Sequence, residues 1–214
     1  MIEIKICGFK RKKDIIDAIS LGIKWIGLNF YEKSLRFISE KEAKILIEDL
    51  PDDIKKIGVF VNPEEKKILE IVKRLRLNGI QLHGNEPPTL LKKFKKLFSE
   101  KILIKAIQVK NKEDVLKKIE RYKKVADFFL LDTYQANSYG GTGKKINYKE
   151  IEDLNLPWNR IFIAGGISPE NIRDIIERIR PFGIDVASGV EIAPGIKDIE
   201  KIKKLIVEVE NVTK

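Results

Sequence analysis

The chain has 214 residues, one cysteine and a formal net charge of +10, with 43% hydrophobic and 35% charged residues. A single cysteine excludes an intrachain disulfide, and no signal peptide or apolar segment of membrane-spanning length is present, so we expect a cytoplasmic protein without membrane association. The lysines are interleaved with Glu and Asp as on solvated helix faces, which argues against a nucleic-acid partner and favours attraction for an anionic small molecule.

The first predicted strand, residues 2–7, ends at the single cysteine. Alternation along it puts Glu3, Lys5 and Cys7 on one face and three isoleucines on the other. A thiol at a strand end beside an ammonium group is placed for chemistry more than for packing, because only the thiolate is a base or a nucleophile and a nearby cation lowers the pKa of the thiol. The alternative is a small buried hydrophobic residue, as most free cysteines are, and this segment alone favours that interpretation.

Strand-like apolar runs and charged amphipathic runs alternate eight times along the chain. The predicted strands are 2–7, 24–29, 55–61, 78–82, 102–107, 126–132, 159–164 and 183–187. The predicted helices are 10–20, 39–49, 63–74, 86–97, 111–123, 147–153, 168–178 and 197–209. This rhythm predicts an α/β protein with one domain over residues 1–214, a (β/α)8 TIM barrel. An open doubly wound sheet is the alternative, but it would normally carry a glycine-rich turn after the first strand.

Several predicted helices begin with residues that typically mark helix starts. Ser39 and Glu42 have the spacing of a capping box, and Asn111 is placed to cap the fifth helix. Pro63 and Pro169 are predicted at the first helical position of their helices. The two tryptophans, at positions 25 and 158, are interpreted as packing residues.

The active site of such a barrel lies at the carboxyl ends of the strands. There the sequence places Cys7, Arg36, His83, which is the only histidine, and Asp132. Acid–base groups and an arginine therefore converge on one rim. Two of these residues have a structural alternative: Asp132 as the ion-pair partner of a lysine, and His83 as a hydrogen-bonding residue under its loop.

Barrel closure would also place the first and eighth strands side by side. Asp185 in the eighth strand would then lie near Lys5. Lys5 is expected to favour the thiolate of Cys7, whereas a pair between Lys5 and Asp185 would mute that effect. The sequence leaves open which of the two residues tunes the cysteine.

Glycine follows both of the last two predicted strands. Gly166 follows the seventh strand, and Ser188 and Gly189 follow the eighth. In these two loops many barrels bind phosphate through backbone N–H groups and the start of a short helix, which we predict at residues 190–192. Glycine can also merely permit a tight turn, but its presence in two consecutive loops favours a phosphate site.

Eight short motifs follow one another along the chain, at residues 5–8, 34–36, 58–61, 81–86, 131–132, 140–143, 164–171 and 185–191. In this order they closely resemble the phosphoribosylanthranilate isomerase family. The resemblance runs from end to end, and the ordered set is specific although no single motif is. Leu35, Thr133 and Ala187 depart from the residues most common in that family.

The resemblance implies an Amadori rearrangement in tryptophan biosynthesis, from N-(5-phosphoribosyl)anthranilate to 1-(2-carboxyphenylamino)-1-deoxyribulose 5-phosphate. It implies that Cys7 is the general base and Asp132 the general acid, with no metal and no organic cofactor. Arg36 would hold the anthranilate carboxylate, and the glycine loop 140–143 would close over the site. The residues implied to bind the substrate are Arg36, His83, Gly143, Gly166, Ser188 and Gly189.

Other functions compete with this one. The histidine-pathway aminoaldose isomerase uses a carboxylate where Cys7 stands, and an indoleglycerol-phosphate synthase would show catalytic Lys and Glu at several strand ends. A basic RNA-binding or scaffold protein would leave the convergence of Cys7, Arg36 and Asp132 unexplained. Both a monomer and a homodimer fit the sequence.

Overall fold

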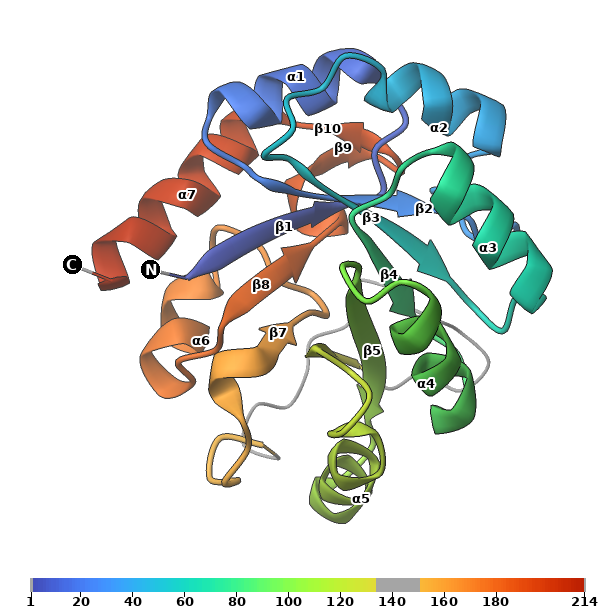
Figure 1. The fold of residues 1–214 in the computed structure, drawn as a ribbon. Helices are drawn as coiled ribbons and strands as arrows, with labels where there is room; N and C mark the ends of the chain where they lie inside the picture. The colour runs from blue at the N-terminus through green and yellow to red at the C-terminus, as the bar shows by residue number, and fades with distance from the viewer. Residues whose placement is uncertain (1, 134–150, 214) are drawn as a thin grey trace.

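The computed structural model describes residues 2–133 and 151–213. Eight parallel strands form a closed barrel in chain order, and the eighth pairs with the first, as the sequence predicts (Figure 1). The strands are β1 (Glu3–Cys7), β2 (Trp25–Asn29), β3 (Lys55–Phe60), β4 (Gly79–Leu82), β5 (Ile102–Val109), β6 (Phe128–Thr133), β7 (Ile161–Ile163) and β8 (Gly183–Val186).

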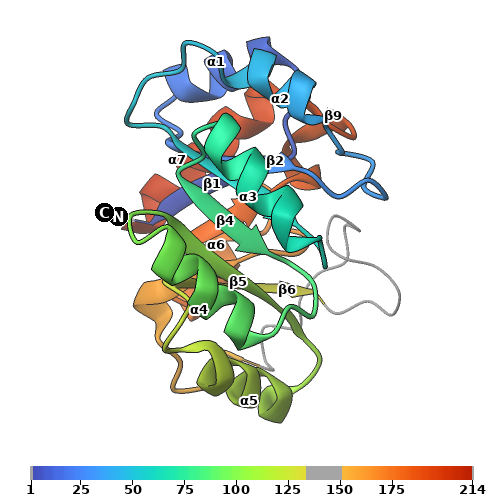
Figure 2. The same ribbon diagram turned by 45° about the vertical axis from the view of Figure 1, so that its right-hand side comes forward.

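Helices surround this barrel (Figures 1 and 2). Those in the described residues are α1 (Lys12–Ser20), α2 (Glu40–Ile47), α3 (Glu65–Arg74), α4 (Pro88–Leu97), α5 (Lys112–Tyr122), α6 (Ile172–Arg178) and α7 (Ile199–Thr213). Of the helix predicted at 147–153, residues 147–150 lie outside the described residues and 151–153 form a turn. After β8 the chain adds a short hairpin, β9 (Glu191–Ala193) and β10 (Ile196–Lys197).

Two of the predicted helix caps are confirmed. At the start of α2 the Ser39 hydroxyl accepts a hydrogen bond from the Glu42 N–H, and the Glu42 carboxylate accepts one from the Ser39 N–H at 2.7 Å. At the start of α5 the Asn111 side chain accepts from the Asp114 N–H at 2.9 Å. Both caps satisfy backbone donors that the first helical turn would otherwise leave without a partner.

The two predicted proline positions are wrong. Helix α3 begins at Glu65, two residues after Pro63, because Asn62 takes the left-handed conformation at φ 43° and its side chain accepts from a neighbouring loop. Helix α6 begins at Ile172, three residues after Pro169. There Asn171 closes a turn by accepting from the Ser168 N–H at 2.9 Å, which delays the helix.

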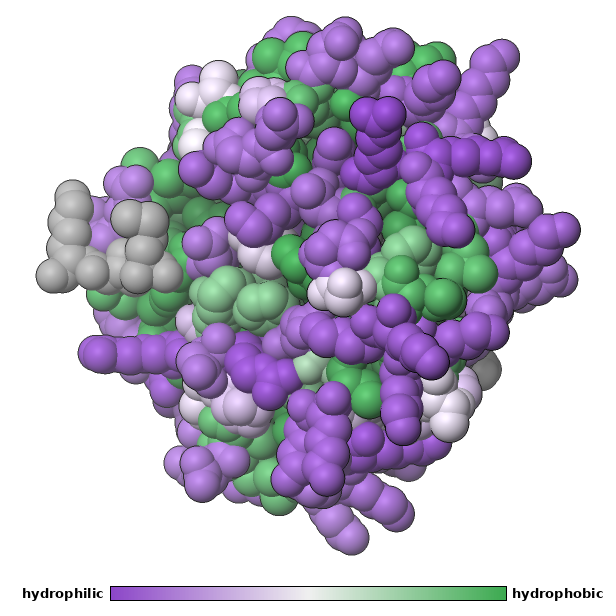
Figure 3. Space-filling model, viewed as in Figure 1, coloured by the Kyte–Doolittle hydropathy of each residue, from purple (hydrophilic) through white to green (hydrophobic). Residues whose placement is uncertain are grey.

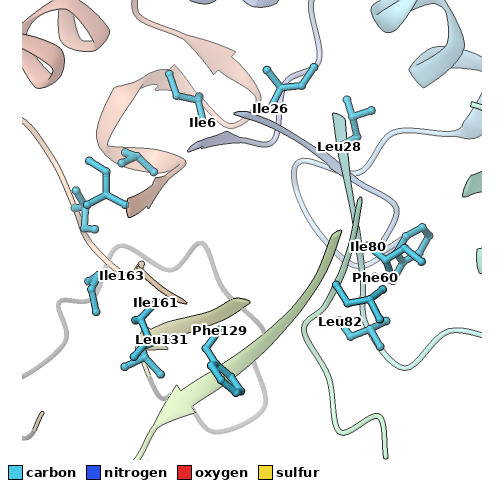
Figure 4. Packing of buried hydrophobic residues seen from close by; sticks show 14 of the residues in the cluster. Ile6, Ile26, Leu28, Phe60, Ile80, Leu82, Phe129, Leu131, Ile161 and Ile163 are labelled. Atoms are coloured by element: carbon cyan, nitrogen blue, oxygen red, sulfur yellow. The ribbon is translucent and has the colours of Figure 1, made fainter. Parts of the chain in front are cut away.

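The strands carry two hydrophobic layers. Residues that point outward pack under the helices, and Figure 4 shows Ile6, Ile26 and Phe129 on the outside of the ring of strands. Inside the barrel, Trp25 packs edge-on against Phe162 with ring centroids 5.2 Å apart, within a separate buried cluster. Apolar side chains thus fill the barrel interior toward the amino ends of the strands. Inward positions nearer the carboxyl ends are left for polar groups. Both tryptophans pack against these layers, as predicted.

Hydrophilic residues cover much of the face seen in Figure 3, with smaller hydrophobic patches between them. Within residues 2–133 and 151–213, none of the helices combines the length and the apolar composition that a bilayer crossing requires.

Candidate active site

One pocket at the carboxyl ends of the strands brings most of the predicted site residues together. It is lined by Cys7 from β1, Asp132 from β6, and Arg36, His83, Gly166 and Ser188 from the loops that follow their strands. Gly189 directly follows Ser188 but does not line the pocket itself. Gly143 and the rest of the 140–143 loop lie outside the described residues.

Cys7 sits at the rim of the barrel, where β2 leaves room for its sulfur atom. A Cβ on Gly27 would lie 2.6 Å from the Cys7 Sγ, so a side chain at that position would displace the thiol.

The predicted ion pair between Lys5 and Asp185 is present. Lys5 Nζ lies 2.8 Å from Asp185 Oδ1, and both side chains are buried. The β1–β8 register sets this pair, because Lys5 stands directly opposite Asp185.

The electrostatics of Cys7 follow from this burial. Burial raises the pKa of the Cys7 thiol above its usual value, and the Asp185 carboxylate raises it further. The positive charges of Lys5, Lys197 and Arg36 lower the pKa without offsetting the effect of burial. Lys5 therefore acts in the expected direction, but the balance leaves the thiol harder to ionise than a free cysteine.

Asp132 is held by two hydrogen bonds. The Thr133 N–H donates to its Oδ1 at 2.8 Å, and His83 Nε2 lies 3.1 Å from its Oδ2. The Gln81 Nε2 donor lies 3.0 Å from His83 Nδ1, so in this arrangement Nδ1 accepts and Nε2 carries the proton that faces Asp132. The side chain that contacts Asp132 is thus the histidine, through a hydrogen bond, rather than a lysine, and His83 both lines the pocket and positions the carboxylate.

The loop that carries His83 rests on a second buried ion pair. Lys105 Nζ lies 2.9 Å from Glu86 Oε2 and also donates to the carbonyl oxygens of Leu82 and Gly84. Both members of the pair are 3% exposed. The pair fixes the backbone on either side of His83, which keeps the ring against Asp132.

The guanidinium group of Arg36 is not free for the substrate alone, because part of it already binds another side chain. Its Nε and Nη2 bind the Glu191 carboxylate, with Nε 2.9 Å from Oε1 and Nη2 2.6 Å from Oε2. Its aliphatic part lies against Gly8, where a Cβ would come 2.4 Å from Arg36 Cδ. Sequence reasoning gave Glu191 no role, because nothing local in the chain signals a contact between residues 155 positions apart.

The two glycine loops lie together at the other side of the pocket. Gly166 has a φ of +64°, in the left-handed region that favours glycine. A Cβ on Gly189 would lie 1.9 Å from the carbonyl oxygen of Ile167, so the two loops are in backbone contact. A short helix is present here as predicted, but at the wrong place: the 3₁₀ helix is Ser188–Val190, and Glu191 begins strand β9 because its side chain folds back to Arg36.

Within the described part of the chain, no group of three or more His, Cys, Asp or Glu side chains is arranged to hold a metal ion.

The barrel and its pocket define the class of protein. It is a (β/α)8-barrel enzyme with a thiol, a carboxylate and an arginine on one rim and two glycine loops facing them.

Comparisons with known proteins narrow this class. A model of the family described as N-(5'phosphoribosyl)anthranilate (PRA) isomerase matches residues 4–208. The chain is 39% identical over 208 residues to the N-(5'-phosphoribosyl)anthranilate isomerase of Thermotoga petrophila, covering 96% of this chain and 97% of the relative. The chain belongs to the N-(5'-phosphoribosyl)anthranilate isomerase family.

Solved structures agree with this assignment. A phosphoribosyl anthranilate isomerase in complex with reduced 1-(o-carboxyphenylamino)-1-deoxyribulose 5-phosphate has a TM-score of 0.83 and 34% identity, covering 99% of this chain and 100% of that one. Monomers of the dimeric enzyme from Thermotoga maritima give a TM-score of 0.84 and 34% identity, with the same coverage.

Proposed function

We propose that this chain catalyses the Amadori rearrangement of N-(5-phosphoribosyl)anthranilate to 1-(2-carboxyphenylamino)-1-deoxyribulose 5-phosphate, with Cys7 as general base and Asp132 as general acid. Family membership supports the reaction. The observation that carries the residue roles is that Cys7 and Asp132 enter one pocket from β1 and β6, which are not neighbouring strands. A substrate between them would meet a base on one side and an acid on the other.

The reaction needs two proton transfers and no change of redox state overall. A proton added to the ribose ring oxygen opens the furanose to an iminium ion, and removal of the C2 proton turns this ion into an enolamine that tautomerises to the ketose. Asp132 would give the first proton, and the hydrogen bonds from His83 and the Thr133 N–H would stabilise the carboxylate left behind. The Cys7 thiolate would take the second. Because burial raises the pKa of Cys7, its thiolate is a stronger base than a free one, although less of it is present at neutral pH.

The remaining pocket residues match the two anionic ends of the substrate. The Nη1 side of Arg36, which is not used by Glu191, would meet the anthranilate carboxylate. Gly166, Ser188 and Gly189 would bind the phosphate through backbone N–H groups at the two contacting loops. The 140–143 loop, with Gly143, would close over the site.

We also propose a cytoplasmic location for this enzyme, which its single cysteine suits. The Thermotoga maritima relative is described as dimeric and has also been obtained as monomers, so a homodimer and a monomer both fit this chain. Light scattering on the purified protein distinguishes the two states.

The purified protein is expected to convert N-(5-phosphoribosyl)anthranilate, which is measured as loss of the substrate's anthranilate fluorescence. Because the reaction uses only side-chain acid and base, turnover should survive dialysis against a chelator. Salt-sensitive retention of RNA with no turnover of this substrate would contradict the proposal and favour a basic RNA-binding protein.

Gly189→Ala tests the phosphate end of the proposal. The added Cβ would clash with the Ile167 carbonyl oxygen and separate the two loops. Since a hydrogen bond to a charged group contributes about 1.5–3 kcal/mol, we expect KM to rise roughly tenfold or more. Steady-state kinetics measures this. Gly22→Ala is the control for a destabilising alanine away from the site, because a φ of +89° strains an alanine there although the new Cβ has no neighbour within 4 Å; unchanged KM in Gly189→Ala would remove phosphate binding from these loops.

A further inference from the structure

Glu191 is the centre of a buried charge cluster beside the pocket. Its carboxylate accepts hydrogen bonds from Nε and Nη2 of Arg36. It also accepts from Lys197 Nζ at 2.7 Å and from the Gly195 N–H at 3.1 Å. Arg36 and Glu191 are each 7% exposed, and Lys197 is 4% exposed. Four donors on one carboxylate leave it no freedom to rotate away from the arginine.

The cluster fixes the direction of the guanidinium group. An arginine side chain normally loses considerable rotamer freedom when it binds a ligand. Here the stem of Arg36 is pressed on Gly8, and two of its three guanidinium nitrogens are bound to Glu191 before any substrate arrives. The Nε–Nη2 edge of the guanidinium is thereby occupied by Glu191. The Nη1 side is the part that an incoming carboxylate would meet.

The cluster places one carboxylate between two basic side chains. Glu191 lies between Arg36 and Lys197, and burial lowers the pKa of Lys197 although the charge of Glu191 opposes this. Burial alone would raise the pKa of Glu191, but the hydrogen bonds from Arg36 and Lys197 and the charge of Lys197 bring it below its usual value. Lys197 also donates to the carbonyl oxygen of Cys7 at 2.5 Å, so the cluster is tied to the strand that carries the base.

We propose that Glu191 is a positioning residue that aims Arg36 at the ortho-carboxylate of the substrate and so makes the enzyme selective for a carboxylated aryl amine. The inference rests on the proposed function and deepens it. Glu191 touches neither the reacting atoms nor the carboxylate; it acts through Arg36. Its effect should therefore depend on whether the substrate carries the carboxylate.

Glu191→Gln is the variant that isolates this effect. The amide keeps the size of the carboxylate but has one acceptor oxygen, and its NH₂ group would face donors from Arg36, Lys197 or Gly195. Arg36 would lose its charged partner and with it a fixed orientation. KM for the carboxylated substrate should rise about tenfold, which corresponds to one lost charged hydrogen bond, while kcat changes much less.

The decisive comparison uses a second substrate, N-(5-phosphoribosyl)aniline, prepared from aniline and ribose 5-phosphate and followed by chromatography. It carries no carboxylate, so its kcat/KM should be nearly the same in wild type and Glu191→Gln. The preference for the carboxylated substrate should fall about tenfold. In an Arg36→Lys background the same substitution should add little, because the two residues act as a unit.

Asp127→Asn is the control. It also replaces a carboxylate that accepts from a lysine side chain and from a backbone N–H, here Lys95 and Leu103, but Asp127 does not line the pocket. It should leave the preference between the two substrates unchanged. Glu191→Asp serves if Glu191→Gln does not fold: it keeps the charge, shortens the reach to Arg36, and should lower the preference by a smaller factor.

The outcomes are distinguishable. Absence of wild-type turnover of either substrate would overturn the proposed function. Wild-type turnover with a preference that Glu191→Gln and Glu191→Asp leave unchanged, or with equal losses on both substrates, would overturn the positioning role and leave the proposed function intact.

Discussion

Cys7→Ala is expected to lower kcat by roughly two to four orders of magnitude, which is the contribution of a positioned general base or acid. Alanine leaves Lys5, Asp185 and the rest of the pocket in place but has no group that accepts a proton from the substrate C2 atom. Asp132→Asn should give a loss of the same order, because an amide keeps the shape of the acid and has no proton to give to the ring oxygen. The fluorescence assay at saturating substrate measures both losses.

Binding is the control for these two variants. Neither residue is proposed to hold the carboxylate or the phosphate, so both variants should bind the reduced product analogue with nearly wild-type affinity. Thermal unfolding checks that the fold is kept. Turnover within about tenfold of wild type for either variant would remove that residue from the acid–base mechanism.

Lys5→Met is expected to lower the free energy of unfolding by about 3–5 kcal/mol, because it leaves the Asp185 carboxylate buried without its partner. This is a large part of the stability of an ordinary domain. Urea denaturation followed by circular dichroism measures the change. A double variant, Lys5→Met with Asp185→Leu, should lose much less, since no unpaired charge remains. Equal losses in the single and double variants would mean that the lost packing, and not the unpaired charge, is what matters.

The same pair predicts how Cys7 titrates. Lys5→Met should raise the pKa of the thiol further, whereas Asp185→Asn should lower it, because Lys5 lowers this pKa and Asp185 raises it. Thiolate absorbance near 240 nm measures both shifts without ambiguity, since Cys7 is the only cysteine. A folded-state pKa above the unfolded value stabilises the protein below the unfolded pKa, and that stabilisation is lost as pH rises toward the folded pKa. Wild type should therefore lose stability in alkali relative to Cys7→Ala.

The strand pattern allowed the barrel and the inward positions to be predicted from sequence. Period two in β1 placed Lys5 and Cys7 on one face, and closure of the barrel then placed Asp185 beside Lys5. The helix caps at Ser39 and Asn111 were predictable because they rest on contacts three residues apart. Where structure depends on such short distances or on regular alternation, the chain itself carries the signal.

The loops were harder to predict, because their conformation depends on partners far away in the chain. Asn62 accepts from Asn85 and Glu191 binds Arg36, and neither contact has a local signature. The short helix predicted at 190–192 lies at Ser188–Val190 instead for this reason. Gln81 carried one usable clue: it is an inward-facing polar residue at the end of a buried strand, where a contact to a site side chain such as His83 is expected.

The Lys5–Asp185 pair also bears on how such a barrel is completed. Its two members are 180 residues apart, on the first and last strands of the ring. In a fragment that ends before β8 the barrel stays open and water solvates the Lys5 ammonium. Closing such a shortened ring would bury that charge without a counter-ion, at an electrostatic cost that Asp185 of the final strand removes. The strand that completes the ring thus also supplies the carboxylate that pairs with Lys5 below Cys7.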